Sequence, residues 1–450
     1  MRAAYEVLRT VRSDDAYANL VLPAVAEHFR LAARDAAFTT ELASGTLRRR
    51  GTYDAVLAAC LDRPLTKLQP AVHDCLRLGV HQLLSMRVPT HAAISTTVDL
   101  VRAVANPGAA GLANAVLRRV AGQDLDAWVA QVAPDRTTDP QKYAEVAFSH
   151  PAWIADELRK AVGGEEWFDL LAADNVPPRV TLVARPGLAT REELPGTPTP
   201  LSPYGVTLEG GSPADVPAVA ERRAGVQDEG SQLVAVALAR AAVEPAAGAT
   251  GGEHWVDLCA GPGGKAALLA ALAAEQGADL VAVERQPHRA GLVRRALTRS
   301  DGTTFPGVTG VVTADGARPP LAPASVDRVL VDAPCTGLGA LRRRPEARWR
   351  RRQEDLVELV LLQRQLLGAA LDAVRPGGVV LYATCSPVLA ETADVVRATL
   401  AGRADVALED VRPLLPEVAD ADGSVEGTVQ LWPHRHGTDA MFLALLRRTG

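Results

Sequence analysis

The stretch 255-WVDLCAGPGGK-265 decides how the second half of this chain folds. It begins with an apolar run, continues through three glycines and a proline, and leads into an Ala- and Leu-rich segment that reaches residue 275. This order predicts a buried strand, a tight turn and a helix. Glycines let a ligand approach the backbone, and the helix start offers free N–H groups. We therefore expect a ligand-binding turn here.

The same pattern repeats toward the C-terminus. Short apolar segments follow as LVAVE at 280–284, VTGVVTAD at 308–315, VDRVLVDAP at 326–334 and GVVLYATCS at 378–386. Helical segments are expected between several of them, at 264–275, 288–298 and 354–374. Val- and Leu-rich strands alternating with helices predict a mostly parallel sheet covered on both faces. Residues 226–450 are thus predicted to form an α/β Rossmann-like domain, whose ligands lie beyond the carboxyl ends of the strands.

The first part of the chain has a different periodicity. Within residues 1–130, apolar side chains recur at helical spacing over 65–88, 92–104 and 109–120, and no alternating strand pattern occurs, which predicts an all-α bundle. Residues 135–225 combine a helical segment, a short strand and a Pro/Gly/Thr-rich passage at 195–217. We interpret them as a small mixed α/β subdomain or linker.

Composition excludes several classes of protein. The 450 residues are 48% hydrophobic and 22% charged, which is typical of globular chains, and the net charge is only −5. No apolar run is long enough to span a membrane, and the N-terminus carries no secretory pattern. Five cysteines without a CxxC pair and nine scattered histidines argue against disulfides and a metal site. We expect a cytoplasmic protein, with no membrane or metal partner and a monomer by default.

An acidic residue completes the expected ligand site. Glu284 ends the strand after the glycine loop, 20 residues beyond Gly264, where a carboxylate can accept both ribose hydroxyls of a nucleotide-type ligand. The loop is not a phosphate-binding Walker A motif, because Cys259 and Ala266 replace the required Gly and Ser or Thr. The alternative is a structural turn followed by a surface acid.

Two cysteines follow two of the predicted strands. Cys335 lies in 329-VLVDAPCTGLG-339 and Cys385 in 381-LYATCSP-387, so both are expected at the same edge of the sheet as the glycine loop. Either alone would most often be a buried structural thiol. The carboxylate of Asp332 three residues before Cys335, beside a second thiol, favours covalent addition to an electron-poor ring.

An arginine-rich run follows Cys335 directly. Seven arginines, one glutamate and one tryptophan occupy residues 342–352. Such a run can contact phosphates and stack on a base, which is typical of RNA binding. The predicted RNA-binding residues are Arg342, Arg343, Arg344, Arg348 and Trp349. The alternative is a solvated charged helix, since nearly every basic residue in this chain is Arg.

These motifs resemble those of the RNA (cytosine-5)-methyltransferases of the RsmB (Sun/Fmu) type. The resemblance rests on VDLCAGPGGK, on VDAPCTGLG with RRRPEARW, on LYATCSP with a following ET, and on the C-terminal WPHRHGTDAMF. The N-terminal LRLGVHQLLSMRVPTHAAISTTVDL and GLANAVLRR are similar to a NusB-like RNA-binding domain, and VQDEGSQ also fits. The resemblance covers nearly the whole chain.

The resemblance implies a cofactor, S-adenosylmethionine, and a role for each motif. Residues that would bind it are Cys259, Ala260, Gly261, Pro262, Gly263, Gly264, Lys265, Glu284, Asp315 and Asp332. It implies that Cys385 is the attacking nucleophile, that Cys335 acts in product release, and that Asp332 faces both the methyl donor and the base.

The expected reaction is methylation of cytosine carbon 5 in RNA, most of all 16S ribosomal RNA. Thiolate addition at carbon 6 activates carbon 5, and the base must be flipped or single-stranded to be attacked from its face. The alternatives are the same chemistry on tRNA or another RNA, a non-catalytic RNA-binding or assembly factor, and a nicotinamide-linked enzyme.

Overall fold

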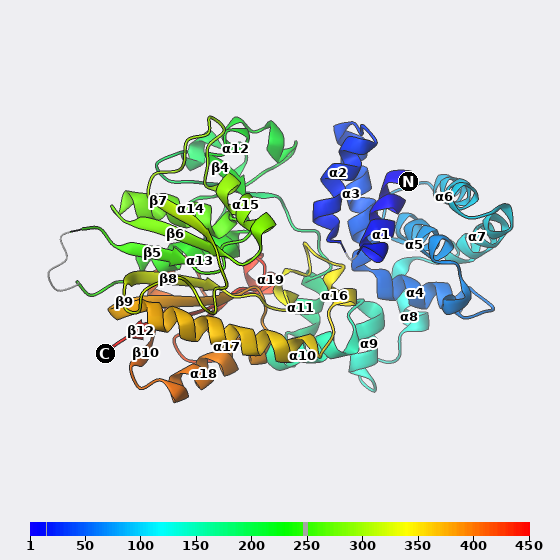
Figure 1. Ribbon diagram of the computed structural model, residues 1–450. Coiled ribbons are helices and arrows are strands. Elements are labelled where there is room, and N and C mark those ends of the chain that lie inside the picture. The colour runs from blue at the N-terminus through cyan, green and yellow to red at the C-terminus, as the bar shows by residue number, and fades with distance from the viewer. Residues whose placement is uncertain (15, 246–250) are drawn as a thin grey trace. The chain divides into compact units, whose positions relative to one another are not determined.

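The computed structural model describes residues 1–14, 16–245 and 251–450, which fold into two compact units. Unit 1 consists of Met1–Pro177 and Leu341–Arg351, and unit 2 of Pro178–Ala340 and Arg352–Gly450 (Figure 1). These limits differ from the predicted division into 1–130, 135–225 and 226–450. The difference arises because the helices between residues 140 and 173 pack onto the preceding bundle, α9 against α4 and α8.

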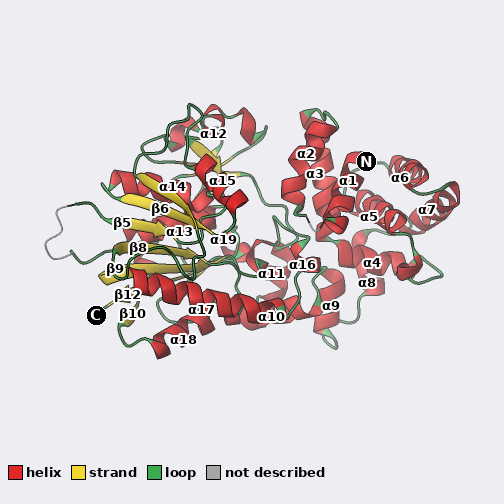
Figure 2. Cartoon of the chain, viewed as in Figure 1, coloured by secondary structure: helices red, strands yellow, loops and turns green. Residues whose placement is uncertain are grey.

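The described part of unit 1 is helical (Figure 2). Its apolar core contains Tyr53, Leu57, Leu76 and Leu117, each fully buried. The helices are α1 (Arg2–Ser13), α2 (Ala18–His28), α3 (Ala33–Arg48), α4 (Arg50–Ala59), α5 (Pro70–Leu84), α6 (Thr90–Val104), α7 (Pro107–Val120), α8 (Leu125–Val132), α9 (Pro140–Ala147), α10 (Ala152–Val162), α11 (Trp167–Ala173) and α16 (Ala347–Arg350).

Three of these helices confirm the predicted ones, with shifted ends. The start of α7 shows why: the Asn106 side chain accepts the backbone N–H of Ala109, and Pro107 occupies the first helical position. An Asn cap followed by Pro fixes a helix start, so the helix begins two residues before the predicted Ala109.

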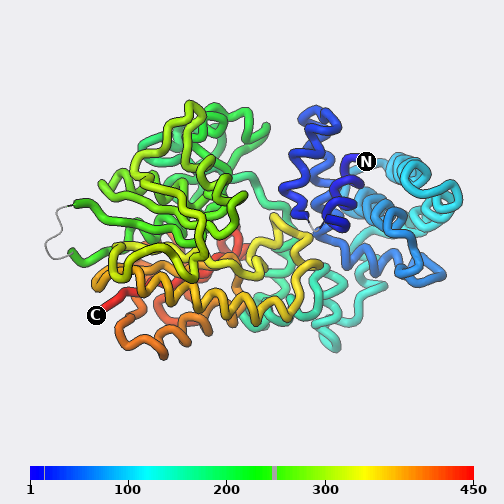
Figure 3. The backbone as a smooth tube through the Cα atoms, in the orientation of Figure 1, coloured from blue at the N-terminus to red at the C-terminus, as the bar shows by residue number. Residues whose placement is uncertain are grey.

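The chain leaves unit 2 after Ala340, contributes residues 341–351 with α16 to unit 1, and returns at Arg352. The tube in Figure 3 follows this excursion in yellow. A single sequence gives no signal that these eleven residues belong to a core formed by the first 177.

The first part of unit 2 is a small antiparallel sheet with strand order β2-β3-β1-β4 and its own apolar cluster, which includes Leu182, Val206 and Ala224. The elements are β1 (Thr181–Ala184), β2 (Thr197–Pro198), β3 (Gly205–Thr207), α12 (Pro217–Ala220) and β4 (Ala224–Val226). The short strand predicted within residues 135–225 is β1. The sequence did not predict β2 or β3, because each has only two or three residues within a Pro- and Gly-rich passage.

The main sheet of unit 2 has eight strands in the order β10-β12-β9-β8-β5-β6-β7, with β11 paired to β12. Strands β5 to β9 are parallel, as predicted. The elements are α13 (Glu229–Arg240), β5 (His254–Asp257), α14 (Gly264–Glu275), β6 (Asp279–Glu284), α15 (Pro287–Ala296), β7 (Val308–Thr313), β8 (Val326–Asp332), α17 (Asp355–Ala373), β9 (Val374–Thr384), α18 (Ala393–Gly402), β10 (Val406–Glu409), β11 (Val429–Gln430), α19 (Pro433–His436) and β12 (Phe442–Arg448).

Two apolar layers enclose this sheet. Leu330 of β8 packs with α13, α14 and α15 on one face, whereas its neighbours Val329 and Val331 pack with α17 and α18 on the other. This alternation follows from the two-residue period of a strand. The fold class predicted from the strand–helix rhythm is confirmed.

One edge of the sheet is antiparallel. Strand β12 pairs with β9 in the opposite direction, and β10 and β11 pair with β12. The strands after residue 400 were not predicted individually. Strand β5 has β6 on one side and β8 on the other, so the order of the parallel strands changes direction beside it. Ligands bind at such a point, beyond the carboxyl ends of the strands. No described helix is long and apolar enough to cross a membrane.

Candidate functional site

The glycine loop after β5 approaches a carboxylate closely. A Cβ atom on Gly261 would lie 2.0 Å from Oε2 of Glu284, and Gly263 has a φ of +112°. The main-chain oxygen of Gly261 accepts a hydrogen bond of 2.6 Å from Arg289 on α15. Glycine is therefore required at position 261 by close approach and at 263 by backbone conformation.

Glu284 ends β6 and is 4% exposed. Its Oε1 accepts the backbone N–H of Gln286 at 2.8 Å, and its Oε2 lies 3.7 Å from Nε of Arg289. The sequence predicted that this carboxylate and the glycine loop meet at one edge of the sheet, and the structure brings them together. Its ribose-binding role stays a prediction.

Asp257, at the end of β5, is a site residue that the sequence reasoning missed. It is fully buried; its Oδ1 accepts the N–H of Cys259 at 3.3 Å and its Oδ2 has no partner. Burial first, and then the charge of Asp332, raise the pKa of Asp257 to about 7. The signal for it was a lone carboxylate inside an apolar strand segment. Burial also raises the pKa of the Cys259 thiol well above its usual value, so Cys259 is a poor nucleophile.

An ion pair links the glycine loop to β8. The Nζ of Lys265, on the first turn of α14, donates a hydrogen bond of 2.8 Å to Oδ2 of Asp332 at the end of β8. Burial by itself would lower the pKa of Lys265, but the charges of Asp332 and Cys385 outweigh it and raise that pKa. A cationic ammonium group therefore lies close to both a carboxylate and a thiol.

The two thiols meet, as the sequence predicted. The Sγ atoms of Cys335, after β8, and Cys385, after β9, lie 3.4 Å apart. The hydrogen bond to Cys385 first, and then burial, raise the pKa of the Cys335 thiol well above its usual value. The raised pKa favours the protonated form of Cys335, and either sulfur can donate the S–H that lies between the two. Cys385 is the more accessible of the two.

The backbone around the thiols is close-packed. The N–H of Gly339 donates to the carbonyl of Cys385 at 2.9 Å, and the N–H of Ala440 donates to the carbonyl of Gly339 at 2.9 Å. A Cβ atom on Gly339 would lie 2.2 Å from the oxygen of Ala440. The C-terminal segment before β12 thus supports the loops that carry Cys335 and Cys385.

Asp315 is predicted to lie beside an adenine. It follows β7, is exposed, and its Oδ1 accepts only the local N–H of Ala317, at 3.1 Å. It lies beyond the carboxyl end of a strand adjacent to β6, as expected. Its adenine contact stays a prediction.

The RNA-binding role of Arg342 and Arg348 stays a prediction, and their burial argues against it, because they are 6% and 0% exposed. Arg348 donates to the carbonyl of Arg48 at 2.9 Å, to Oδ1 of Asn175 at 2.8 Å and to the carbonyl of Asp174 at 2.8 Å. Burial lowers the pKa of Arg348 to about 9. A guanidinium that satisfies internal carbonyls cannot also reach a phosphate, so Arg348 stabilises unit 1.

The other arginines of the run and its tryptophan are more open. Arg344 is exposed, with its guanidinium 5.2 Å from the ring centroid of Tyr17. Trp349 is half-buried, and one of its faces is covered by Arg50 at 5.2 Å. RNA binding by Arg343, Arg344 and Trp349 stays a prediction.

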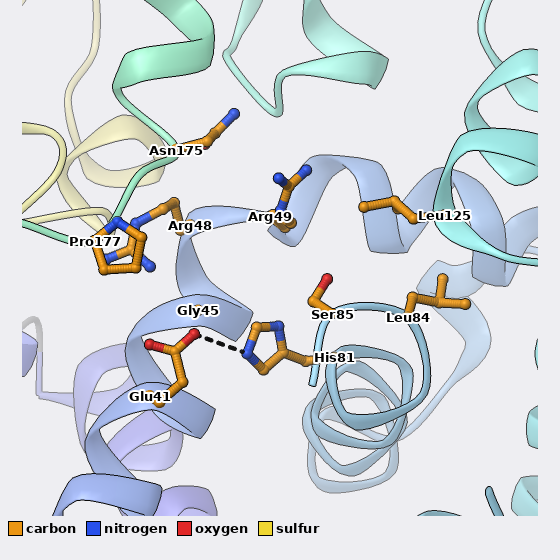
Figure 4. Close-up of a pocket in the computed structure, with 10 residues that line it drawn as sticks. All are labelled: Glu41, Gly45, Arg48, Arg49, His81, Leu84, Ser85, Leu125, Asn175 and Pro177. Carbon is orange, nitrogen blue, oxygen red and sulfur yellow. Dashed lines mark ion pairs between the residues drawn. The ribbon is translucent and has the colours of Figure 1, made fainter. Parts of the chain in front are cut away.

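Unit 1 also contains a pocket of ≈ 260 Å³ that the sequence reasoning did not predict (Figure 4). The buried Nε2 of His81 lies 3.6 Å from Oε1 of Glu41, and its Nδ1 lies 2.8 Å from the hydroxyl of Tyr53. Burial lowers the pKa of His81, which favours the neutral form of its ring. The lining residues are Glu41, Gly45, Arg48, Arg49, His81, Leu84, Ser85, Leu125, Asn175 and Pro177.

Comparison with known proteins gives a consistent result. Residues 247–447 match the family model described as 16S rRNA methyltransferase RsmB/F, and residues 2–122 match that of the NusB family. The chain is 33% identical to the ribosomal RNA small subunit methyltransferase B of Salmonella newport over 439 residues, covering 94% of this chain and 95% of that protein.

The chain belongs to the RsmB/F family of 16S rRNA methyltransferases. It is an RNA methyltransferase with an N-terminal NusB domain, as the motifs predicted. A putative methyltransferase of Mycobacterium tuberculosis, Rv1407, is 51% identical over 99% of this chain and 96% of its own length.

Solved structures share the fold of this RsmB/F family member. The crystal structure of PH0851 matches with a TM-score of 0.77 and 23% identity, covering 99% of this chain and 97% of its own. The crystal structure of NSun6 from Pyrococcus horikoshii with SFG matches with a TM-score of 0.55 and 18% identity, covering 67% and 98%. Across residues 1–14, 16–245 and 251–450, no group of three or more His, Cys, Asp or Glu side chains is placed to hold a metal ion.

Proposed function

We propose that this protein transfers a methyl group from S-adenosylmethionine to carbon 5 of a cytosine in 16S ribosomal RNA. The observation that carries the proposal is the 3.4 Å separation of Cys335 and Cys385. The ion pair of Lys265 with Asp332 belongs to the same cluster, since the charge of Asp332 acts on Cys335 and that of Cys385 acts on Lys265. Two thiols, a carboxylate and an ammonium group suit addition to a pyrimidine ring and its reversal.

The residues beyond β5 and β6 fit the proposed cofactor. The carboxylate of Glu284 occupies the space that a side chain at Gly261 would fill, so the absence of a side chain there lets the carboxylate lie directly against the loop. Asp257, the last residue of β5 before the same loop, has a buried carboxylate oxygen without a hydrogen-bond partner. The chemistry that S-adenosylmethionine supplies is an electrophilic methyl group on a sulfonium. The crystal structure of NSun6 with SFG, an analogue of this cofactor, supports the proposal that S-adenosylmethionine is the cofactor.

In the proposed first step, the sulfur of Cys385 adds to carbon 6 of the cytosine. Cys335 keeps its proton and donates S–H to that sulfur before the attack, which leaves Cys385 as the group that can react as thiolate. The ammonium of Lys265 favours the same ionisation electrostatically. Ring nitrogen 3 is protonated from solvent by way of the Asp332 carboxylate, so that carbon 5 becomes nucleophilic.

In the proposed second step, a base removes the proton from the methylated carbon 5, and the bond from carbon 6 to Cys385 breaks. A hydrogen bond to the Cys385 sulfur is the first cause of the high pKa of Cys335. That cause weakens once Cys385 is a thioether, because its sulfur then carries no charge. Cys335 can therefore release its own proton to solvent in the adduct and take the carbon-5 proton. Elimination then regenerates the Cys385 thiolate and the Cys335 thiol, and ring nitrogen 3 returns its proton to solvent by way of Asp332.

The cytosine must leave any base stack before Cys385 can attack its face, so we expect a flipped or single-stranded target. The same chemistry on tRNA or another RNA is the second candidate. The 33% identity to a small subunit methyltransferase over most of the chain favours the ribosomal target.

The test is to map 5-methylcytosine in all RNAs of a strain lacking the gene by bisulfite sequencing. Loss of one site in 16S rRNA, restored by the wild-type gene and not by a gene encoding Cys385→Ala, is the expected result. Loss at a tRNA site instead would select the second candidate, and an unchanged map would refute the proposed reaction.

A further inference from the structure

We propose that Glu391 is the positioning residue that keeps the two thiols together, because one carboxylate binds both loops that carry them. Glu391 lies in a short 3-10 turn, Leu389–Glu391, between β9 and α18. The effect of Glu391 on the reaction rests on the proposed function. The geometric part of the inference, the control of the distance between Cys335 and Cys385, stands without it.

The carboxylate binds the residue that directly follows each thiol. Its Oε1 accepts the backbone N–H of Thr336 at 2.8 Å, and its Oε2 accepts the hydroxyl of Thr336. Its Oε2 also accepts the hydroxyl of Ser386 at 2.6 Å. Thr336 follows Cys335 and Ser386 follows Cys385, so a change in either bond moves a cysteine by way of a single peptide unit.

The two loops are separate parts of the sequence that meet at this carboxylate. The hydroxyl oxygens of Thr336 and Ser386 lie 3.0 Å apart, both against Oε2. The side-chain amide of Gln363 on α17 donates to Oε1 at 3.0 Å and to the carbonyl of Pro334 at 2.9 Å. Glu391 thus joins the loop after β8, the loop after β9 and helix α17.

Burial gives this arrangement its strength. Glu391, Thr336 and Ser386 are 0–1% exposed, so water does not compete for these bonds. Each carboxylate oxygen accepts hydrogen bonds from two donors, so the roughly four acceptor positions of the carboxylate are all used. The hydroxyl of Tyr382 donates to the main-chain carbonyl of Glu391 at 2.7 Å, which fixes the backbone that carries the side chain.

Glutamine cannot replace this glutamate. Its amide nitrogen accepts no hydrogen bond, so in Glu391→Gln two of the four donors lose their acceptor. If the amide oxygen keeps the N–H of Thr336, the buried hydroxyls of Thr336 and Ser386 must accept from the amide nitrogen and find other acceptors for their own protons. The N–H of Thr336 has a fixed direction, whereas its hydroxyl can rotate away. The two donors that face the amide nitrogen of the new glutamine must find other partners. We therefore expect the loops of Cys335 and Cys385 to move apart.

The separation can be measured without RNA or cofactor. Diamide, an azo compound, takes two electrons and two protons from two thiols, which join as a disulfide while diamide becomes a hydrazine. Sulfur atoms 3.4 Å apart need little movement to reach the ~2 Å of a disulfide. We expect the Cys335–Cys385 disulfide, quantified by peptide mass spectrometry, to form at least about tenfold more slowly in Glu391→Gln than in the wild type.

Val396→Ala is the matched control for stability. Val396 is fully buried on α18, five residues after Glu391, and packs in the apolar layer without a polar contact to either thiol loop. Its truncation leaves a cavity and destabilises the unit. A merely structural role for Glu391 predicts the same slower disulfide formation in Val396→Ala, whereas the positioning role predicts the wild-type rate there.

Methyl transfer supplies the second measurement. Elimination requires Cys335 next to the adduct on Cys385, so Glu391→Gln should accumulate a denaturant-resistant protein–RNA adduct and lower kcat, with cofactor KM near the wild-type value. The charge of Glu391 also contributes to the high pKa of Cys335. The pH midpoint for alkylation of Cys335 should therefore fall in Glu391→Gln.

The outcomes separate the two proposals. Slower disulfide formation in Glu391→Gln alone supports the positioning role, even if no RNA is methylated. Wild-type disulfide formation in Glu391→Gln, or equal slowing in Val396→Ala, overturns it. Failure of the proposed function would appear as wild-type protein that transfers no methyl group although its two thiols still join rapidly.

Discussion

The carboxylate of Glu284 lies where a side chain at Gly261 would be: a Cβ atom there would be 2.0 Å from Oε2. Van der Waals contact between carbon and oxygen requires well over 3 Å, so alanine at 261 must displace the carboxylate or the loop. Glu284 is buried and bonded to the N–H of Gln286, which leaves its side chain little room to move. The loop and the acid therefore form one unit of the ligand site.

Gly261→Ala should weaken cofactor binding while the protein stays folded. We expect at least about a tenfold loss in affinity for S-adenosylhomocysteine in a calorimetric titration, about 1.4 kcal/mol. Gly368→Ala is the control, since nothing lies within 4 Å of a Cβ at that position in α17 and Gly368 is not among the proposed cofactor residues. Ala also favours a helix over Gly. Equal affinities of the two variants would contradict the proposed role of Gly261.

Cys385→Ala should abolish methyl transfer and leave cofactor affinity close to that of the wild type. The thiol reacts with the base, and no backbone contact of Cys385 depends on its sulfur. The measurement is incorporation of a labelled methyl group into RNA, with a parallel titration of S-adenosylhomocysteine. Full residual transfer by Cys385→Ala would refute its role as nucleophile.

Cys335→Ala should stop the reaction after the adduct has formed, one step later than Cys385→Ala. The adduct on Cys385 can form, but the residue that takes the carbon-5 proton is missing, and general acid–base help of this kind contributes about 10²–10⁴ in rate. A protein–RNA band that resists denaturant should accumulate on a gel. The double variant Cys335→Ala/Cys385→Ala must give no band, and a band there would show that the link does not involve Cys385.

How much of the site could be predicted depended on whether the signal was local. The glycine loop, Glu284 and both thiols each follow a recognisable apolar strand, and the carboxyl ends of parallel strands share one edge of a sheet. That rule alone brought Cys335 and Cys385 together. Glu391 and Asp257 lie within the quoted motifs, in the ET after LYATCSP and in VDLCAGPGGK, but the motifs gave neither residue a role, because their importance depends on burial and on their partners.

The arginine run shows where local signals fail. Its composition predicts a solvated, phosphate-binding surface, and Arg344 is indeed exposed. Arg348, four residues later, is fully buried because carbonyls of residues 48 and 174 and the amide of Asn175 surround it. Only the three-dimensional arrangement reveals acceptors that lie at least 170 residues away in sequence.

Asp257 should make stability depend on pH. The pKa of this carboxyl is raised from its usual 3.8 to about 7, by burial first. Between these values the unfolded chain has lost the proton that the folded protein keeps, so stability falls as the pH rises through this window. The lost stability is at most ~4 kcal/mol, because each pKa unit is worth about 1.4 kcal/mol.

Asp257→Asn should therefore gain stability relative to the wild type as the pH rises, since the amide stays neutral throughout. Urea unfolding near pH 5 and near pH 8 measures the difference. Asp315→Asn provides the control, because it removes the same charge from an exposed position. If the effect of Asp257→Asn is equal at both pH values, the buried carboxyl does not titrate in this window.

Arg348→Met tests whether the arginine run is internal structure or RNA contact. Methionine fills much of the same volume but leaves the carbonyls of Arg48 and Asp174 and the amide oxygen of Asn175 without a buried donor. Each unsatisfied buried acceptor costs ~1–3 kcal/mol, and less where a carbonyl keeps another partner. We therefore expect the free energy of unfolding of unit 1 to fall by roughly 2–4 kcal/mol. The measurement is hydrogen exchange in α3, whose last residue is Arg48.

Arg344→Met is the matched control, because it removes the same charge four residues away at an exposed position. Its effect on exchange in α3 should stay within about 0.5 kcal/mol. The slope of RNA affinity against salt separates the two roles further. A lost phosphate contact reduces that slope by about one, whereas an internal arginine leaves it unchanged. A reduced slope in Arg348→Met with undisturbed exchange would mean that Arg348 leaves its buried site to bind RNA.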